Sequence, residues 1–216
     1  MAGSCVTSSA DTRRRARLVV MLKEPRPGRV KTRLGRDIGH VRAAWWFRHQ
    51  VASLLRRLDD PRWQLVLAVS PDHAGIASRV WPAHLPRMPQ WRGDLGARMG
   101  RIMRTLPPGP ACIIGGDIPG VRPDHVARAF AALGRHDAVF GPAPDGGFWL
   151  MGLRRTAPPP TAMFRGVRWS GPHALTDSMA SLPDARIALV DTLQDVDTAA
   201  DLPGSANARP ACHFRP

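Results

Sequence analysis

The chain of 216 residues has few of the features that mark secreted, zinc-binding or membrane-spanning proteins. It has 3 cysteines, Cys5, Cys112 and Cys212, at wide spacing and with no CxxC pair. An odd number of scattered cysteines argues against a disulfide framework and a zinc site, and it favours a reducing compartment. The 8 histidines are also scattered and include no HxxxH pair, so we expect them to be solvated or packing residues.

Long apolar runs are also absent. No stretch approaches the roughly 18 apolar residues that a membrane-spanning helix requires. Only the short apolar run Leu18–Leu22 follows the N-terminal arginines before Lys23, which is too little for the core of a secretory signal. The sequence therefore predicts a cytoplasmic protein with no membrane contact.

Lysine is scarce, although the formal net charge of the chain is +14. Only Lys23 and Lys31 are lysines, so almost all of the positive charge is arginine, and it is spread along the chain. This distribution indicates a biased composition rather than a nucleic-acid-binding face, and no nucleic-acid motif or row of interleaved aromatics supports such a face. We expect small-molecule partners and disfavour nucleic acid; the sequence predicts no particular oligomeric state.

The chain has the organisation of one domain with two tails. Residues 1–16 are small, polar and basic, residues 203–216 are rich in proline, glycine, alanine and arginine, and we expect both segments to be disordered. Residues 17–202 alternate strand and helix patterns with no internal repeat or linker. This alternation predicts an α/β domain with a mostly parallel sheet and helices on both faces.

Short apolar runs give the predicted strands: Arg17–Leu22, Gln64–Val69, Ala111–Gly115, Ala138–Phe140, Phe148–Leu153 and Arg186–Val190. Helical spacing of apolar residues gives the predicted helices: Ile38–Leu58, Ile76–Val80, Asp94–Leu106, Pro123–Leu133 and His173–Leu182. The longest helix has an expected apolar side of Val41, Ala44, Trp45, Val51, Leu54, Leu55 and Leu58. The turn Asp145–Gly147 joins two strands directly, so one part of the sheet is predicted to be antiparallel.

A basic loop, residues 23–34, follows the first strand at the sheet edge where open α/β proteins bind ligands. It is neither a Walker A loop nor a GxGxxG. Gly28 lets backbone N–H groups approach an anion, and Pro25 and Pro27 stiffen the loop. Its cations include Lys23, Lys31 and Arg33. A solvated basic loop is the alternative, but the density of charge between prolines and a glycine favours phosphate binding.

Three aspartates follow later strands. Asp117 lies in G-G-D-I-P-G after the strand Ala111–Gly115, and Asp195 and Asp197 lie in L-Q-D-V-D-T after the last strand. Two residues apart in an extended segment, Asp195 and Asp197 project to the same side. With Asp117 they predict a Mg²⁺ or Mn²⁺ site that bridges the phosphates of a ligand. The alternatives are a turn or capping role for Asp117 and a helix cap at Asp197 or Thr198.

Two further segments carry candidate residues. In Q-W-R-G-D-L-G-A-R-M, the residues Gly93, Asp94, Gly96 and Arg98 stand at a helix start, where N–H groups and the guanidinium could meet a base, ribose or phosphate. In P-A-P-D-G-G-F-W-L-M-G, the residues Asp145, Gly146 and Gly147 either present a carboxylate to an acceptor or form a hairpin turn. Trp149 and Trp169 are expected in the core.

The motifs occur in the order seen in a family of bacterial GT-A-like transferases, which the chain resembles over about residues 17–202; they are K-E-P-R-P-G-R-V-K-T-R-L, G-D-L-G-A-R-M, G-G-D-I-P, G-P-A-P-D-G-G-F-W-L-M-G and D-V-D-T-A-A-D-L. Members are described as glycosyltransferases associated with radical-SAM or selenium domains or with arsenosugar biosynthesis. The family is also similar to guanylyltransferases that act on 2-phospholactate or on the molybdenum cofactor. The resemblance implies a Rossmann-like GT-A nucleotide-diphospho-sugar transferase fold. It also implies nucleotide phosphates near Gly28 and Lys31 and metal ligation by Asp117 and Asp197.

The chain departs from the family pattern at two places. The family usually begins its loop with Phe-Ala-Lys, whereas this chain has Met21, Leu22 and Lys23. The aromatic pair after the glycines is usually tyrosine, whereas this chain has Phe148 and Trp149 and no tyrosine anywhere. A tyrosine hydroxyl therefore cannot bind the acceptor, although stacking on an aromatic ring remains available.

The sequence thus predicts a metal-dependent transferase that moves a glycosyl group from a nucleoside-diphosphate sugar to a small acceptor. Lys31, which offsets the diphosphate charge, and Asp145, which contacts or activates the acceptor, are the expected catalytic residues. The expected nucleotide-binding residues are Lys23, Pro27, Gly28, Lys31, Arg33, Gly93, Asp94 and Arg98. The alternatives are nucleotidyl transfer from a nucleoside triphosphate to a small phosphorylated acceptor, and a non-catalytic nucleotide- or nucleic-acid-binding protein.

Overall fold

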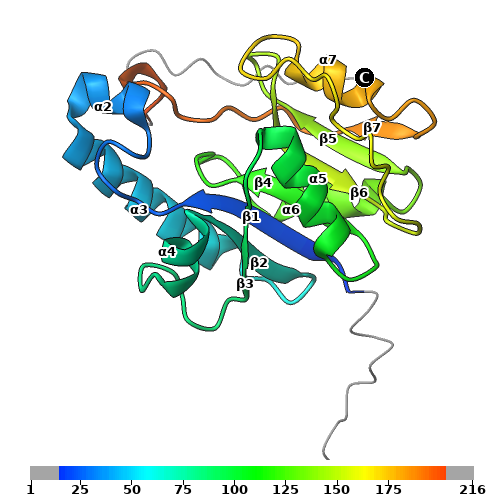
Figure 1. Ribbon diagram of the computed structural model, residues 1–216, viewed down its shortest axis with the longest axis horizontal. Helices are drawn as coiled ribbons and strands as arrows, with labels where there is room; N and C mark the ends of the chain where they lie inside the picture. The colour runs from blue at the N-terminus through cyan, green and yellow to red at the C-terminus, as the bar shows by residue number, and fades with distance from the viewer. Residues whose placement is uncertain (1–14, 203–216) are drawn as a thin grey trace, which may run out of the picture.

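The computed structural model describes residues 15–202, which form a 7-stranded sheet in the order β3-β2-β1-β4-β6-β5-β7 (Figure 1). The strands are β1 (Arg17–Lys23), β2 (Gln64–Ser70), β3 (Arg87–Pro89), β4 (Ala111–Gly115), β5 (Ala138–Pro142), β6 (Phe148–Leu153) and β7 (Ile187–Leu189). The helices are α2 (Thr32–Ile38), α3 (His40–Leu58), α4 (Asp72–Ala77), α5 (Leu95–Thr105), α6 (Pro123–Ala132), α7 (Ala174–Ala180) and the 3₁₀ turn η1 (Ala199–Asp201). The predicted tail 203–216, and residues 1–14 of the predicted N-terminal tail, lie outside the described residues.

The sheet is mixed but mostly parallel. Strand β1 pairs in parallel with β2 and β4, β2 with β3, and β5 with β7. Strand β6 runs antiparallel to both of its neighbours, β4 and β5. The predicted α/β class is therefore confirmed, and the antiparallel part lies where the Asp145–Gly147 turn indicated. The carboxyl ends of β1, β4, β5 and β7 consequently share one edge of the sheet.

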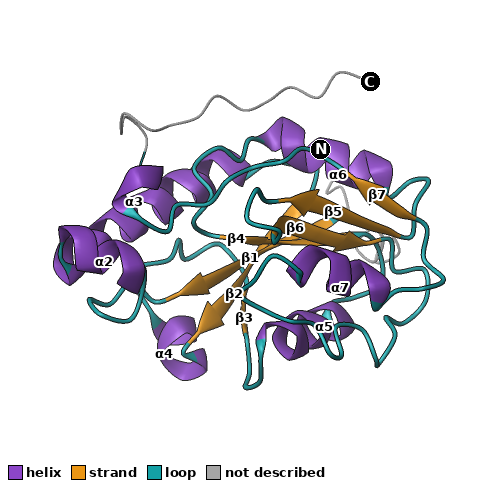
Figure 2. Ribbon diagram, turned by 90° about the horizontal axis from the view of Figure 1, so that it is seen from above, coloured by secondary structure: helices purple, strands orange, loops and turns teal. Residues whose placement is uncertain are grey.

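Helices cover both faces of the sheet, α3 and α6 on one and α5 and α7 on the other (Figure 2). Side chains of a strand alternate between the two faces. In β1, Leu18, Val20 and Leu22 belong to the core under α3 and α6, whereas Val19 belongs to the core under α5. Of the 3 cysteines, Cys112 is buried in β4 and its thiol is free, while the other two lie outside the described residues.

The predicted helix Ile38–Leu58 is wrong at its start. Gly39, with φ 90° and ψ 140°, ends α2 and separates it from α3. Two residues of the expected apolar side are also exposed, Val41 by 59% and Trp45 by 57%. Trp45 follows the buried Ala44, and successive residues of a helix are rotated by about 100° around its axis, so the Trp45 side chain points away from the core. The first turn of α3 lies beside α2 rather than over the sheet, which exposes Val41 (Figure 1).

Two short elements between β2 and α5 also differ from the prediction. Helix α4 spans Asp72–Ala77 rather than Ile76–Val80. It begins directly after Pro71 and has Asp72 in its first turn, and the backbone is extended again at Ser78. Strand β3 was not predicted because it has only 3 residues. Its extended conformation depends on pairing with β2 rather than on its own composition. The remaining predicted boundaries differ by a few residues at most.

Candidate active site

Lys31 connects the basic loop to the edge of the sheet. Its backbone is left-handed, with φ 45° and ψ 50°, at the N-cap of α2. Its Nζ atom lies 2.6 Å from Oδ2 of Asp117 and 2.9 Å from Oδ1 of Asp197, and only 7% of the side chain is exposed. Burial lowers the pKa of Lys31, but the adjacent carboxylates of Asp117 and Asp197 raise it by more, so the ammonium group stays charged.

An extended segment after β7 brings the C-terminal aspartates to this edge. The backbone N–H of Val190 donates to the carbonyl of Phe140 at 2.9 Å, and that of Leu193 donates to Pro142 at 3.1 Å. The N–H of Val196 then donates to the carbonyl of Asp117 at 3.1 Å. The segment therefore runs from the end of β5 past the end of β4, so the three predicted carboxylates meet.

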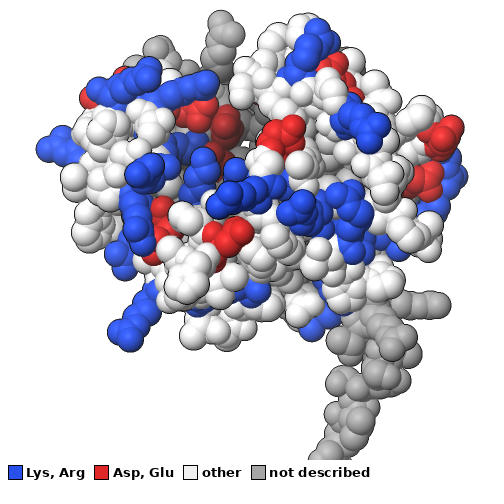
Figure 3. Space-filling view, in the orientation of Figure 1, with Lys and Arg blue, Asp and Glu red and all other residues white. Residues whose placement is uncertain are grey.

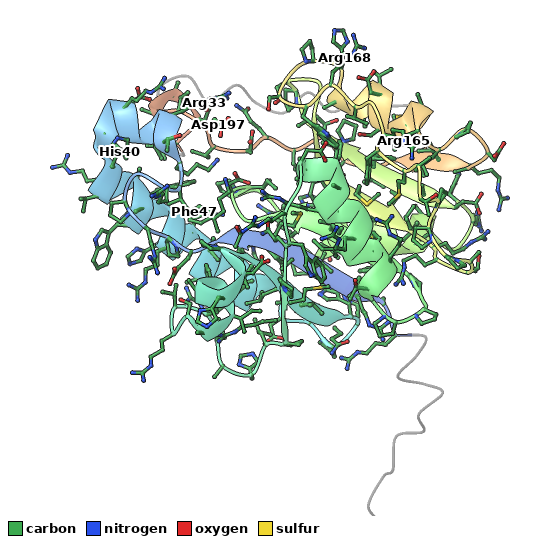
Figure 4. All side chains as sticks on the ribbon, viewed as in Figure 1. Arg33, His40, Phe47, Arg165, Arg168 and Asp197 are labelled. Atoms are coloured by element: carbon green, nitrogen blue, oxygen red, sulfur yellow. The ribbon has the colours of Figure 1, made fainter. Side chains whose placement is uncertain are left out.

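Arg33 binds the far side of the same carboxylate. Its Nη1 atom donates to Oδ2 of Asp197 at 2.9 Å, and Figure 4 shows the two side chains next to each other between α2 and the segment before η1. The Arg33 side chain is 66% exposed, whereas that of Lys31 is largely buried. Solvent screens an exposed pair more strongly, so Lys31 makes the stronger contribution to holding Asp197 in place.

Asp117, Asp195 and Asp197 form a carboxylate cluster whose ligand oxygens all lie within 4.8 Å of one another. Burial and the charges of Asp117 and Asp197 raise the pKa of Asp195 to about 6. Among the described residues, none donates a hydrogen bond to the Asp195 carboxylate. Three oxygen donors with one lacking a partner fit a hard divalent cation such as Mg²⁺ or Mn²⁺.

A cavity of about 880 Å³ opens at this edge of the sheet, and most of the predicted binding residues line it. Its basic residues are Lys23, Arg29, Lys31, Arg33 and Arg98, and its acidic residues are Asp94, Asp117, Asp145 and Asp197. Figure 3 shows acidic side chains recessed in this region and basic side chains around them. The cavity therefore combines the cations that bind phosphate with the carboxylates that bind metal.

Some predicted site residues lie apart from the cavity lining. Pro27 and Gly28 are exposed in the loop before α2, where Gly28 adopts φ 72°. Gly96 does not open the backbone to a ligand, because it packs under Trp169: a Cβ there would lie 2.8 Å from Cζ2 of that ring. Gly146, with φ 84°, forms the hairpin turn and packs against Pro172. The glycines thus act mainly by allowing turns and close packing.

Asp94 and Arg98 both line the large cavity and also make local structural bonds. The Asp94 carboxylate accepts from the N–H of Ala97 at 2.7 Å and so caps α5. The Nε atom of Arg98 donates to the carbonyl of Gly93 at 2.9 Å. Within residues 15–202, the Nη atoms of Arg98 and the N–H of Gly93 form no further hydrogen bond.

Gln90 is a cavity-lining residue that the sequence analysis missed. The residue is 3% exposed, and its side-chain Nε2 atom donates to the carbonyls of Leu22 at 3.0 Å and Ala68 at 2.8 Å. These two bonds link the ends of β1 and β2 and fix the orientation of the amide. No periodicity or motif in the sequence indicates this role.

Trp149 packs in the core as predicted and Trp169 is half-buried against the core, and both line a second, smaller cavity of about 250 Å³. This cavity adjoins the large one at Asp117 and Asp145, which line both. Asp195 lines the smaller cavity and Asp197 the larger. The carboxylate cluster therefore lies at the junction of the two cavities.

Comparison with known proteins identifies the family of the chain. A sequence model of the family described as "Uncharacterized protein conserved in bacteria (DUF2064)" matches residues 53–171. The chain belongs to this family. The match to the DUF2064 family spans β4, with Asp117 after it, and the β5–β6 hairpin, with Asp145 in its turn. No curated protein matches the sequence.

Solved structures share the fold. A Desulfovibrio desulfuricans G20 protein described as a "putative nucleotide-diphospho-sugar transferase" has 29% sequence identity and a TM-score of 0.75, over 85% of this chain and 82% of that one. The inositol-1-phosphate CTP transferase of T. maritima has 13% identity and a TM-score of 0.55, over 90% and 94% of the chains. A CMP:2-keto-3-deoxy-manno-octonic acid synthetase has 13% identity and a TM-score of 0.54, over 86% and 94%. The last two show the fold alone.

These comparisons support a transferase-like nucleotide-diphospho-sugar transferase fold for this member of the DUF2064 family. Within residues 15–202, no helix is long and apolar enough to cross a membrane.

Proposed function

We propose that this protein is a metal-dependent glycosyltransferase that uses a nucleoside-diphosphate sugar as donor and a small molecule as acceptor. The observation that carries the proposal is the meeting of loop cations and strand-end carboxylates in one cavity of about 880 Å³. A nucleoside diphosphate with its divalent cation presents the complementary charges, because its phosphates pair with the loop cations and its cation pairs with the carboxylates. The likeness to the D. desulfuricans protein supports a donor of the nucleotide-sugar class.

The donor phosphates lie, in this proposal, between the basic loop and the carboxylate cluster. Lys31 and Arg33 offset the negative charge that grows on the leaving diphosphate, with Lys23 and Arg98 as further contacts. The turn at Pro27 and Gly28 sets the path of the loop, and the N-terminal turn of α5, with Gly93 and its cap Asp94, faces the nucleoside part.

Asp117, Asp195 and Asp197 would hold Mg²⁺ or Mn²⁺, which supplies electrostatic stabilisation of the leaving diphosphate when bound. Lys31 contacts two of the three carboxylates, at 2.6 and 2.9 Å, so the same ammonium group faces both the cluster and the donor phosphates. Asp145 is the proposed acceptor-contacting residue, because it lines both the large and the small cavity.

A thermal-unfolding panel tests the proposal. We expect nucleoside-diphosphate sugars, with Mn²⁺ but not without it, to raise the unfolding temperature. A ligand at about 100 times its Kd adds about 2.7 kcal/mol to the free energy of unfolding. Asp117→Ala should remove the metal dependence. Stabilisation by nucleoside triphosphates alone would favour nucleotidyl transfer. Tight RNA binding without a metal-dependent effect of any nucleotide would refute an enzymatic function.

A further inference from the structure

The smaller cavity has a wall made of aromatic rings. Phe148 and Trp169 lie with ring centroids 6.3 Å apart and planes at 63°, and Trp169 in turn packs against Phe164 at 5.9 Å. The indole N–H of Trp149 donates to the carbonyl of Asp191 at 2.7 Å, which fixes that ring. Phe148, at the start of β6, and Trp169, in the loop before α7, line the smaller cavity, so an apolar surface faces the space beside the carboxylate cluster.

The charge of the smaller cavity is opposite to that of the basic loop. Its lining includes Asp117, Asp145 and Asp195, and no lysine or arginine of residues 15–202 is part of it. The Asp145 carboxylate accepts one bond, from the N–H of Gly147 at 2.9 Å. The larger cavity, in contrast, has five basic residues in its lining. The two halves of the site are therefore matched to ligands of different charge.

We infer that the smaller cavity is the acceptor site and that it takes an uncharged or cationic, ring-bearing molecule with a hydroxyl or amino nucleophile, and excludes phosphorylated acceptors. This inference rests on the proposed function. A ring stacks on the aromatic wall, and the nucleophile lies against Asp145. A phosphate or carboxylate in this place would face the Asp145 carboxylate, which stays free when Asp117 and Asp195 hold the metal, and no guanidinium or ammonium group of residues 15–202 lines this cavity to pair with it.

The proposed transfer forms one bond and breaks one bond. The acceptor oxygen or nitrogen forms a bond to the anomeric carbon of the donor sugar, and the bond from that carbon to the diphosphate oxygen breaks. The bonding electrons leave with the nucleoside diphosphate. The proton of the nucleophile passes to the Asp145 carboxylate, which lines both cavities, and from there to water. Nucleotidyl transfer to a phosphorylated acceptor would instead require a phosphate group in the acidic cavity.

Three ligands that share one ring test the charge selectivity: benzyl alcohol, benzylamine and benzyl phosphate. Their dissociation constants are measured by ligand-detected NMR on the full chain, with the diamagnetic Mg²⁺ and a nucleoside diphosphate at saturation so that the basic cavity is filled. We expect the alcohol and the amine to bind at least ten-fold more tightly than the phosphate. Equal or tighter binding of benzyl phosphate would overturn the inference.

Variants locate the binding in the smaller cavity. Trp169→Leu should weaken the alcohol and the amine at least ten-fold, Trp169→Phe should retain most of the binding, and Asp145→Asn should reduce the preference for them over the phosphate. Trp45→Leu is the matched control, because Trp45 is 57% exposed on α3 and lines neither cavity. If Trp169→Leu and Trp45→Leu have the same effect, the cavity is not the binding site.

The thermal-unfolding panel separates the two proposals. If nucleotides and Mn²⁺ stabilise the protein but benzyl phosphate binds as well as benzyl alcohol, the acceptor inference fails and the proposed donor site stands. If the alcohol and amine are preferred but no nucleotide stabilises the protein, the proposed function fails instead.

Discussion

Lys31 and Asp197 are 166 positions apart in the sequence, yet the Nζ atom of Lys31 lies 2.9 Å from Oδ1 of Asp197. The same ammonium group lies 2.6 Å from Oδ2 of Asp117, so one side chain links the basic loop, the end of β4 and the C-terminal segment. A metal ion bound by these carboxylates would compete with the ammonium group for the same oxygens. Loss of Lys31 should therefore affect nucleotide binding, whereas loss of a carboxylate should affect metal binding.

We expect Lys31→Met to leave Mn²⁺ binding unchanged or tighter, since the variant removes a cation that competes for the carboxylate oxygens. The affinity of the Mn²⁺-loaded protein for a nucleoside diphosphate should fall at least ten-fold, which corresponds to about 1.4 kcal/mol. Isothermal titration calorimetry measures both constants.

Two variants serve as comparisons for Lys31→Met. Asp117→Asn should lose Mn²⁺ binding, and Arg33→Ala should weaken nucleotide binding less than Lys31→Met, because the Arg33 side chain is 66% exposed and its ion pair is screened. Loss of Mn²⁺ binding in a folded Lys31→Met protein would contradict the assigned roles.

The sequence predicts the parts of this site better than their assembly. The buried strand at β4 and the α/β order follow from apolar patterns, and Asp117 and Asp197 were identified because they follow strands. The position of Gln90 could not be predicted, because its two hydrogen bonds go to carbonyls of strands that are brought together only by the folded sheet. The aromatic wall likewise depends on Trp169, which tertiary packing places beside Phe148.

Asp177 should make the stability of the protein dependent on pH through its bonds to the Trp169 loop. Its carboxylate accepts from the backbone N–H of Arg168 at 3.0 Å, and from Nε at 2.8 Å and Nη2 at 2.9 Å of the same residue. These hydrogen bonds to Arg168 hold the pKa of Asp177 well below its usual range. A lowered native pKa means that the stabilisation is complete above the ordinary aspartate pKa of about 3.9 and is lost as the pH falls below it.

The comparison of wild type with Asp177→Asn measures this contribution. Urea unfolding followed by tryptophan fluorescence should show the wild type to be more stable at pH 6, with a difference that narrows as the pH falls below about 4. If the difference in unfolding free energy between wild type and Asp177→Asn is constant from pH 6 to pH 3, the hydrogen bonds to Arg168 do not lower the pKa of Asp177 in the folded protein.

Gln90 and Gln50 form a matched pair for stability. Gln90→Leu leaves the carbonyls of Leu22 and Ala68 without the donors that they have in the native protein, which should cost roughly 1–3 kcal/mol. Gln50 on α3 has a buried Nε2 atom with no hydrogen-bond partner in residues 15–202, so Gln50→Leu should cost nothing or increase stability. Urea unfolding of both variants checks the order; equal losses would mean that the Gln90 bonds contribute no net stability.

Two glycines of α5 should respond in opposite ways to alanine. At Gly100, the nearest atom to a new Cβ is Nη1 of Arg104 at 3.2 Å, the end of a flexible side chain, so Gly100→Ala should stabilise the helix by about 0.5–1 kcal/mol. At Gly96, a Cβ would lie 2.6 Å from Cβ of Phe164 and 2.8 Å from Cζ2 of Trp169. Gly96→Ala must therefore displace the aromatic wall, at a cost of roughly 1–3 kcal/mol.

The same pair links the packing of α5 to the acceptor site. Urea unfolding should give the two stability changes, and the benzyl alcohol titration should show weaker binding in Gly96→Ala but not in Gly100→Ala. Since neither variant alters a charged group, Mn²⁺ affinity should be the same in both. Unchanged benzyl alcohol binding in a destabilised Gly96→Ala protein would show that Trp169 can move without affecting the cavity, and that the ring contact assigned to it is wrong.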